Sequence, residues 1–394
     1  MIFCKKKKFY LEIFLLFFLT LYSIRSATIS FKEAQLDSYD FKKTWGSLKL
    51  LSEKVNHYEY SLNNINKTID GKRVIENTEG GYSHLFYIIL YPFSLLDWEK
   101  SKIVWSSMNI LLTILIPFLI GKKLNLSKKQ IFIAITMFFI SFPVRTNIAM
   151  GQHSLLILLF FSLPFLINNK WSIMLSGISY CKYNIGYALF LYYLKNKKYL
   201  FYSLIPSILG WLLYSLITNS NIIVNLFEPL KLTILNPITT ADLEFFFGFL
   251  KFFKFYEKFT NVKLILFLLC IFVNAYLIFT IQNKIKDNIY KLSLISLSAL
   301  IFLPHWGHDY VFLLPLAMIS AKYLNTTLGK FNIFLITYFI FLDGYLLKFL
   351  FLFNIDFSYI TFWSHQYLCY IFFFILLVNL NMCKEFNNIN INKN

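Results

Sequence analysis

The feature that most restricts how this chain can fold is a series of long apolar runs separated by short clusters of lysine. The first run extends from Phe9 to Ile24 and follows Lys5–Lys8. Over the whole chain only 15% of the residues are charged, whereas a soluble domain carries about 25%. So few charges could not solvate the surface of a soluble fold of 394 residues. We therefore predict an all-α polytopic membrane protein, and we exclude ordinary soluble enzymes, disordered tails, collagen and disulfide scaffolds.

Charge and cysteine usage exclude further classes. The net charge of +18 would suggest nucleic acid binding in a soluble chain, but here many of the lysines lie in short segments between apolar runs. Short cytoplasmic loops of membrane proteins collect Lys and Arg. No basic-aromatic RNA motif and no zinc-finger spacing is present, so we expect no nucleic acid partner. The cysteines show no CxxC spacing and predict neither a disulfide framework nor a zinc site.

The first apolar run predicts a cytoplasmic N-terminus, because four lysines precede it. A signal peptide cleaved near Ser26–Ala27 is the alternative, but we favour an uncleaved span that tethers the next segment. That segment, residues 25–81, is then the first outer loop. Within it, apolar residues at helical spacing with charged residues on the other face predict an amphipathic helix in the membrane interface. Its apolar members are Phe41, Trp45, Leu48, Leu51 and Val55.

The chain as a whole, residues 1–394, predicts one membrane domain with about eleven or twelve crossing helices. Residues 82–96 contain Pro92 and are barely long enough to span, so we predict a re-entrant or interfacial segment on the outer side. The other expected spans lie near 102–120, 130–147, 152–168, 199–217, 262–282, 289–303, 308–321, 331–350 and 361–381.

Residues 171–194 are ambiguous: they form either one span or two short helices that meet at Cys181–Asn184. A lysine at the bilayer midplane costs about 3 kcal/mol on insertion scales. The basic loop Lys195–Lys198 belongs on the cytoplasmic side. Both arguments favour two short helices with Lys182 facing outward.

This topology gathers the polar residues that interrupt apolar segments at the outer face. The stretch from Ser101 to Phe227 contains no acid, so its basic groups lack carboxylate partners of their own. Such groups suggest an anionic ligand, and an outward pocket with basic walls and acids in an adjoining loop suits transfer from a lipid phosphate. The residues in question are Asp37, Asp40, His84, Arg145, Gln152, His153, Lys182, His305, His308 and Asp309.

Each of these residues also has a structural interpretation. Asp40 is either the N-cap of the amphipathic helix or a catalytic acid, and Asp37 a solvated loop acid. Arg145 and Lys182 either bind a ligand or anchor lipid head groups, and the residues around Trp306 are typical of an interfacial aromatic belt. His84 and His153 fit a structural role better than a catalytic one. Two carboxylates are a weak metal signal, so we expect no metal, and no Walker loop, GxSxG, HExxH or GxGxxG motif is present.

Five short motifs, in this order along the chain, resemble the membrane glycosyltransferases of the GT-C superfamily, and most closely glycosyltransferase family 87, the polyprenyl-phosphate-mannose-dependent mannosyltransferases. The likeness covers most of residues 30–320. The chain departs from the family's frequent pattern at Phe93 and Tyr183, where the family often has proline, and it lacks the glycine expected before a tyrosine after the amphipathic helix. The motifs are Asp40-Phe41, Tyr91-Pro92, Gly151-Gln152, Lys182 and Trp306-x-His308-x-Tyr310.

The resemblance implies an inverting transfer of a mannose-like hexose from a polyprenyl-phosphate donor to a lipid-linked or glycan acceptor. By position, Asp40 would be the general base, with Asp37 second, and His308 with His305 would bind donor phosphate or orient the acceptor. The donor phosphate pocket would be lined by Lys182, Arg145 and Gln152. No cofactor is implied, membrane lipids are the other partners, and we expect a multi-pass protein of the bacterial inner membrane.

Three other functions remain open at this point. A transporter or lipid-linked glycan flippase predicts inverted repeats and polar groups at the midplane, whereas no repeat is evident and the polar groups cluster at one face. A glycan ligase shares the donor type, but it would usually carry a larger late outer loop than residues 218–260. A non-catalytic membrane subunit is the third alternative.

Overall fold

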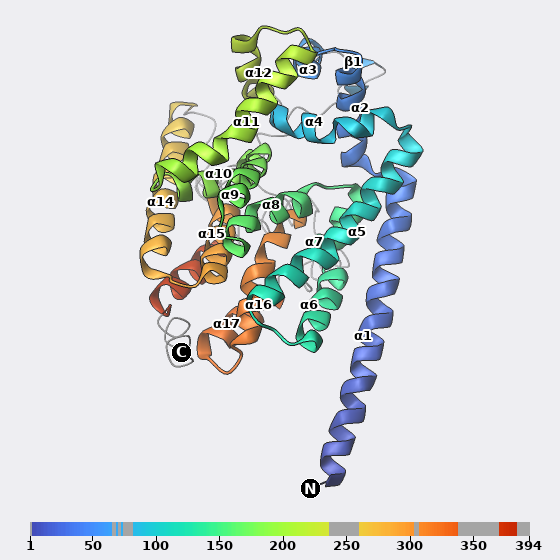
Figure 1. Cartoon of the computed structure of the whole chain (residues 1–394), viewed down its shortest axis with the longest axis vertical. Helices are drawn as coiled ribbons and strands as arrows, with labels where there is room; N and C mark the ends of the chain where they lie inside the picture. The colour runs from blue at the N-terminus through green and yellow to red at the C-terminus, as the bar shows by residue number, and fades with distance from the viewer. Residues whose placement is uncertain are drawn as a thin grey trace.

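The computed structural model describes residues 2–64, 68–69, 72–73, 82–235, 260–302, 307–337 and 370–383. Apart from one two-residue hairpin, the regular structure in these residues is helical, which confirms the all-α prediction. Figure 1 shows the helices gathered into a bundle, with α1 along one edge and extending well beyond it at the N-terminus.

The labelled elements follow one another along the chain with short connections. They are α1 (Ile2–Asp37), α2 (Tyr39–Ser52), α3 (His57–Asn64), β1 (Thr68–Ile69), β2 (Lys72–Arg73), α4 (His84–Leu90), η2 (Tyr91–Leu95), α5 (Trp98–Lys123), α6 (Lys128–Ile140), α7 (Phe142–Met150), α8 (Ser154–Leu166), α9 (Lys170–Ser176), η3 (Gly177–Cys181), α10 (Tyr183–Tyr193), α11 (Lys197–Ile217), α12 (Ile222–Leu235), α14 (Thr260–Lys284), α15 (Asn288–Phe302), η5 (Gly307–Leu313), α16 (Leu314–Lys322) and α17 (Thr327–Thr337).

Three helices are long and apolar enough to cross a membrane, namely Glu12–Asp37 within α1, α5 and α11. The expected span 130–147 is instead a pair of helices, α6 and α7, bent by 60°. Proline at the second position of α7 explains the break, because it cannot donate the hydrogen bond that would continue α6. Shorter apolar helices make up the rest of the bundle, and the expected spans 331–350 and 361–381 lie largely outside the described residues.

The first helix corrects one predicted boundary. The outer loop was expected to begin at residue 25, but α1 continues as helix through Asp37. The added segment contains neither glycine nor proline, and its small residues Ser26, Ser30 and Ala34 are buried. The Ser26 hydroxyl also donates to the Phe139 carbonyl over 2.9 Å. Tertiary packing therefore extends the helix beyond its apolar run.

The amphipathic helix in the outer segment is confirmed as α2. Phe41, Leu48 and Leu51 are fully buried, whereas Trp45 is half-buried and Val55 lies exposed beyond the helix end. The segment around Pro92 forms α4 followed by the short 3-10 helix η2, so it is broken, as its length and proline suggest.

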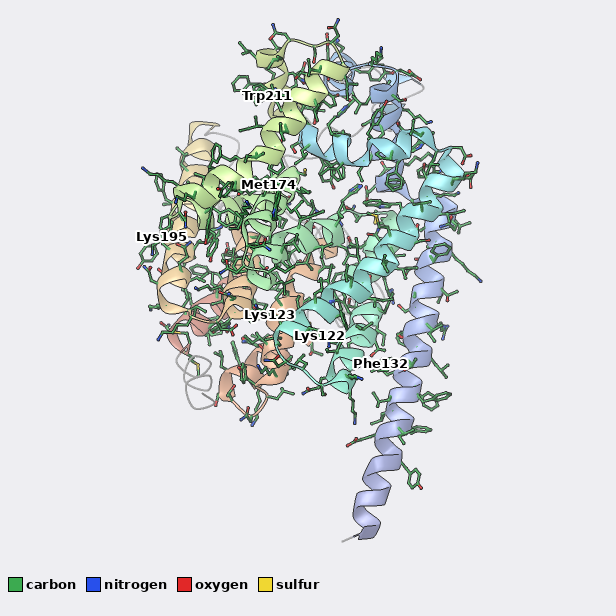
Figure 2. The ribbon with its side chains drawn as sticks, in the orientation of Figure 1. Lys122, Lys123, Phe132, Met174, Lys195 and Trp211 are labelled. Carbon is green, nitrogen blue, oxygen red and sulfur yellow. The ribbon has the colours of Figure 1, made fainter. Side chains whose placement is uncertain are left out.

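Several of the lysine clusters lie at the end of the bundle away from α2. Lys129 pairs with Glu12 in α1 at 2.6 Å, which places the α5–α6 turn beside the N-terminal part of α1. Lys195 donates to the Asn283 side chain over 2.5 Å, so the α10–α11 turn meets the end of α14. Figure 2 labels Lys122 and Lys123 where α5 ends, opposite its start near α2.

Candidate active site

Three segments that are distant in sequence meet near the start of α2. They are the first turn of α2, the tight turn between α7 and α8, and the break between η3 and α10 with η5 packed against it. Each segment contributes polar side chains in a region where most neighbours are buried and apolar. Such side chains need partners, and their partners define the site.

Asp40 lies in the first turn of α2 but does not cap it. The N-cap position belongs to Ser38, which leaves the Asp40 carboxylate available for other contacts. Its Oδ2 accepts a hydrogen bond from the side-chain amide of Gln152. Burial raises the pKa of Asp40 above its usual value of 3.8, against the attraction of Lys43, the Gln152 hydrogen bond and the attraction of Lys182. The capping interpretation of Asp40 is thus wrong.

The turn that carries Gln152 depends on Gly151. Gly151 has φ of +69° and ends α7 in the left-handed conformation, which favours glycine. A Cβ on Gly151 would lie 2.5 Å from the Cβ of Phe41, so the turn and α2 are in close contact. The Gly151 carbonyl accepts from the Trp105 indole over 2.9 Å. These contacts fix the turn directly beneath Asp40.

His153, the next residue, is fully buried between α2 and the segment before α4. Its Nδ1 lies 3.1 Å from the Tyr82 hydroxyl and its Nε2 lies 3.5 Å from the Thr44 hydroxyl. This supports a structural role for His153. His84 lies in a separate cluster, where its Nε2 is 3.0 Å from the Asn225 side-chain oxygen.

Lys182 lies at a break in the helix, as predicted. α9 and α10 are two short helices joined by the 3-10 turn η3, and Lys182 is the extended residue between η3 and α10, with φ of −105° and ψ of 92°. Its buried ammonium forms an ion pair with Asp309, which is fully buried. The expectation that Lys182 lacks a carboxylate partner is therefore wrong, because η5 supplies one from a distant part of the chain.

Two further side chains complete the Lys182 cluster. The Ser154 hydroxyl donates to Asp309 Oδ1 over 2.6 Å and lies 2.9 Å from the Lys182 Nζ. His308 Nε2 lies 3.5 Å from the same Nζ. The Asn147 amide donates to the His308 carbonyl over 2.7 Å, which fastens η5 to α7. A lysine ammonium and an imidazole nitrogen thus converge at one point.

The structure brings together four of the seven predicted site residues. Asp40, Gln152, Lys182 and His308 lie around the α7–α8 turn. Asp37 is exposed at the end of α1, and Arg145 is half-buried on α7. Within the part of the chain that the structure describes, no side-chain hydrogen bond or ion pair is formed by either. His305 lies outside the described residues.

Sequence reasoning did not assign a role to Asp309, Ser154 or Asn147. A signal for Asp309 was present, because a buried lysine in a stretch without acids requires a carboxylate from elsewhere, and Asp309 adjoins His308. Ser154 and Asn147 carry no such signal. A metal was not expected, and no group of three His, Cys, Asp or Glu side chains comes together in the described ranges.

Comparison with known proteins adds a family match that covers the centre of the site. Residues 82–227 match the model of glycosyltransferase family 87. No curated protein and no solved structure matches the chain. The matched segment includes Gln152 and Lys182 and ends before His308, while Asp40 lies upstream of it. Over residues 82–227 the chain is similar to glycosyltransferase family 87, and this match indicates a membrane glycosyltransferase.

Proposed function

We propose that the protein transfers a mannose-like hexose from a polyprenyl-phosphate donor to a lipid-linked or glycan acceptor, with inversion at the anomeric carbon. The observation that carries this proposal is the arrangement around the α7–α8 turn. Gln152 reaches the Asp40 carboxylate, and Ser154, two residues later, reaches Lys182 and Asp309. A base and a cation are thus held close together by one short segment.

Asp40 is the general base of the proposed reaction. It accepts the proton of the acceptor hydroxyl while the hydroxyl oxygen forms a bond to the anomeric carbon of the donor sugar. The bond from that carbon to the phosphate oxygen breaks, and the phosphate oxygen keeps the electron pair. One displacement inverts the configuration. The raised pKa of Asp40 makes the carboxylate a better proton acceptor than an exposed aspartate.

The phosphate of the donor is the proposed ligand of Lys182 and His308. As the sugar departs, polyprenyl phosphate gains a negative charge, and hydrogen-bond donors already in place at that point lower the barrier. The Lys182 ammonium and His308 Nε2, 3.5 Å apart, supply such donors. Arg145 and His305 are proposed as further contacts to the phosphate. The mechanism requires no metal and no nucleotide.

The apolar helices suit a donor that is itself a lipid. They would hold the isoprenoid tail in the bilayer while the phosphate reaches the site at the membrane surface. We propose that this surface is the outer face of a bacterial inner membrane, with the N-terminal lysines and the α5–α6 turn in the cytoplasm.

The test is the transfer of labelled sugar from polyprenyl-phosphate sugars by purified protein in lipid nanodiscs. Asp40→Asn removes the base and keeps the shape of the side chain, so we expect transfer to fall by about 100- to 10,000-fold. Glu53→Gln, at the exposed end of the same helix, is the matched control and should retain activity. Asp37→Asn is run beside them as the second candidate base.

Equal transfer by wild type and a folded Asp40→Asn protein would exclude Asp40 as the base. Loss in Asp37→Asn alone would move the role to Asp37. Absence of transfer by the wild-type protein from every donor and acceptor offered would argue against a polyprenyl-phosphate glycosyltransferase and for a lipid-linked glycan transporter.

A further inference from the structure

We propose that Gln152 is a positioning residue for Asp40, whose side-chain amide holds one carboxylate oxygen and leaves the other for the acceptor hydroxyl. The inference rests on the proposed function, in which Asp40 is the base. It also gives Gln152 a role different from the one expected from sequence, where Gln152 belonged to the donor phosphate pocket. The contact between the Gln152 amide and Asp40 Oδ2 is the starting point.

The backbone on either side of Gln152 is fixed by side chains from α5. The Asn109 amide donates to the Gln152 carbonyl over 3.2 Å, and the Trp105 indole donates to the Gly151 carbonyl over 2.9 Å. The Gln152 N–H donates to the Asn147 carbonyl over 2.9 Å. Gln152 is itself buried. Its amide is therefore directed by the backbone and has little freedom to choose another partner.

The helix that carries Asp40 is fixed against the same turn. Phe41 stacks on Trp105 with ring centroids 5.0 Å apart and planes 4° from parallel. The absence of a side chain on Gly151 lets Phe41 approach the turn, since a Cβ there would meet it at 2.5 Å. Trp105 thus contacts both the helix and the turn. The distance between the Asp40 carboxylate and the Gln152 amide is set by packing.

The chemistry of an amide suits this task. An amide N–H donates to a carboxylate and does not exchange protons with it, so it favours the ionised form without competing as an acid or a base. Across the described part of the chain, Asp40 Oδ1 accepts no hydrogen bond, which leaves this oxygen open. The charged groups that act on Asp40 are Lys43 on its own helix and Lys182 from the break before α10.

The test is the pH dependence of transfer by Gln152→Met, which keeps the length of the side chain but cannot donate. Loss of the hydrogen bond raises the pKa of Asp40 further. Because the base acts only when ionised, activity is lost as the pH falls through that pKa. The acid limb of the kcat/KM profile for the acceptor should therefore move to higher pH.

Two further variants keep the test decisive. Gln152→Glu places a second carboxyl against Asp40 and should move the acid limb further in the same direction, because two carboxyls at one site disfavour ionisation of both. Gln130→Met removes an amide from the exposed capping box of α6 and should leave the profile unchanged. If Gln152→Met misfolds, Gln152→Glu carries the test.

A uniform fall in rate at every pH, with the acid limb in place, would overturn the proposal and leave Gln152 a structural residue. Infrared titration of the Asp40 carboxyl, assigned with Asp40→Asn, is the second measurement. It should show the same shift in Gln152→Met without any sugar transfer. An inactive wild type would count against the proposed function, while an unshifted infrared titration would count against the role of Gln152.

Discussion

The ion pair between Lys182 and Asp309 joins residues from two distant parts of the chain in the protein interior. Asp309 is fully buried, and Lys182 is 8% exposed. A buried charge that has lost its partner destabilises a protein more than an apolar pair at the same place. The pair therefore fixes the broken helix to η5, and with it the position of His308.

We expect Asp309→Asn to lower the stability by about 3–5 kcal/mol, because the Lys182 ammonium then stays buried without a counterion. Thermal unfolding in detergent measures the loss. The double variant Lys182→Met/Asp309→Leu removes both charges and should be more stable than the single variant. Asp97→Asn, which removes an acid from the exposed pair with Lys100, should unfold at the wild-type temperature. An unchanged unfolding temperature for Asp309→Asn would contradict this account.

At the scale of secondary structure, the site depends on where α2 begins. Ser38 is the N-cap, so Asp40 and Lys43 fall on the same side of the first turn, three residues apart. Lys43 attracts the ionised carboxylate, whereas its neighbour Lys42 points to solvent. The helix thus provides its own matched pair of lysines.

We expect Lys43→Met to move the acid limb of transfer to higher pH. The variant loses the attraction that lowers the pKa of Asp40, and the carboxyl then takes up its proton at a higher pH. Lys42→Met is the control and should keep the wild-type profile. The pH dependence of kcat/KM is the measurement, at low salt, because salt screens the attraction. Identical shifts in both variants would point to surface charge in general.

The elements of the site differ in how far the sequence predicts them. The periodicity of Phe41, Leu48 and Leu51 predicts α2, and the cost of a lysine at the midplane predicts the break at Lys182. These are local signals. The pairing of Lys182 with Asp309 depends on tertiary packing between segments 127 residues apart, and no periodic pattern encodes it. The same holds for Gln152 and Asp40, which were both singled out but not paired.

At the scale of the whole molecule, the two ends of α5 lie at opposite ends of the bundle. Its start at Trp98 lies near α2, and its end at Lys123 adjoins the α5–α6 turn (Figure 1). The contact between Lys129 and Glu12 ties this turn to the N-terminal part of α1. The lysine distribution then predicts which end is cytoplasmic.

We expect a cysteine at Lys100 to react with an impermeant maleimide from outside the cell, and a cysteine at Lys123 to react only from the cytoplasmic side. Both positions are exposed ends of one helix, so each serves as the control for the other. Labelling of intact cells and of inverted vesicles is the measurement. The opposite pattern would reverse the topology and place Asp40 in the cytoplasm.

The helix α1 has a further consequence for the site. It is continuous from Ile2 to Asp37, and Ser38 alone separates it from α2. At 1.5 Å per residue a helix of this length measures about 54 Å, well beyond the bilayer core of about 30 Å. The depth of Asp40 is therefore coupled to the tilt of α1. Bilayer thickness, which governs such tilt, would act as a mechanical control on how the base meets the lipid-borne phosphate.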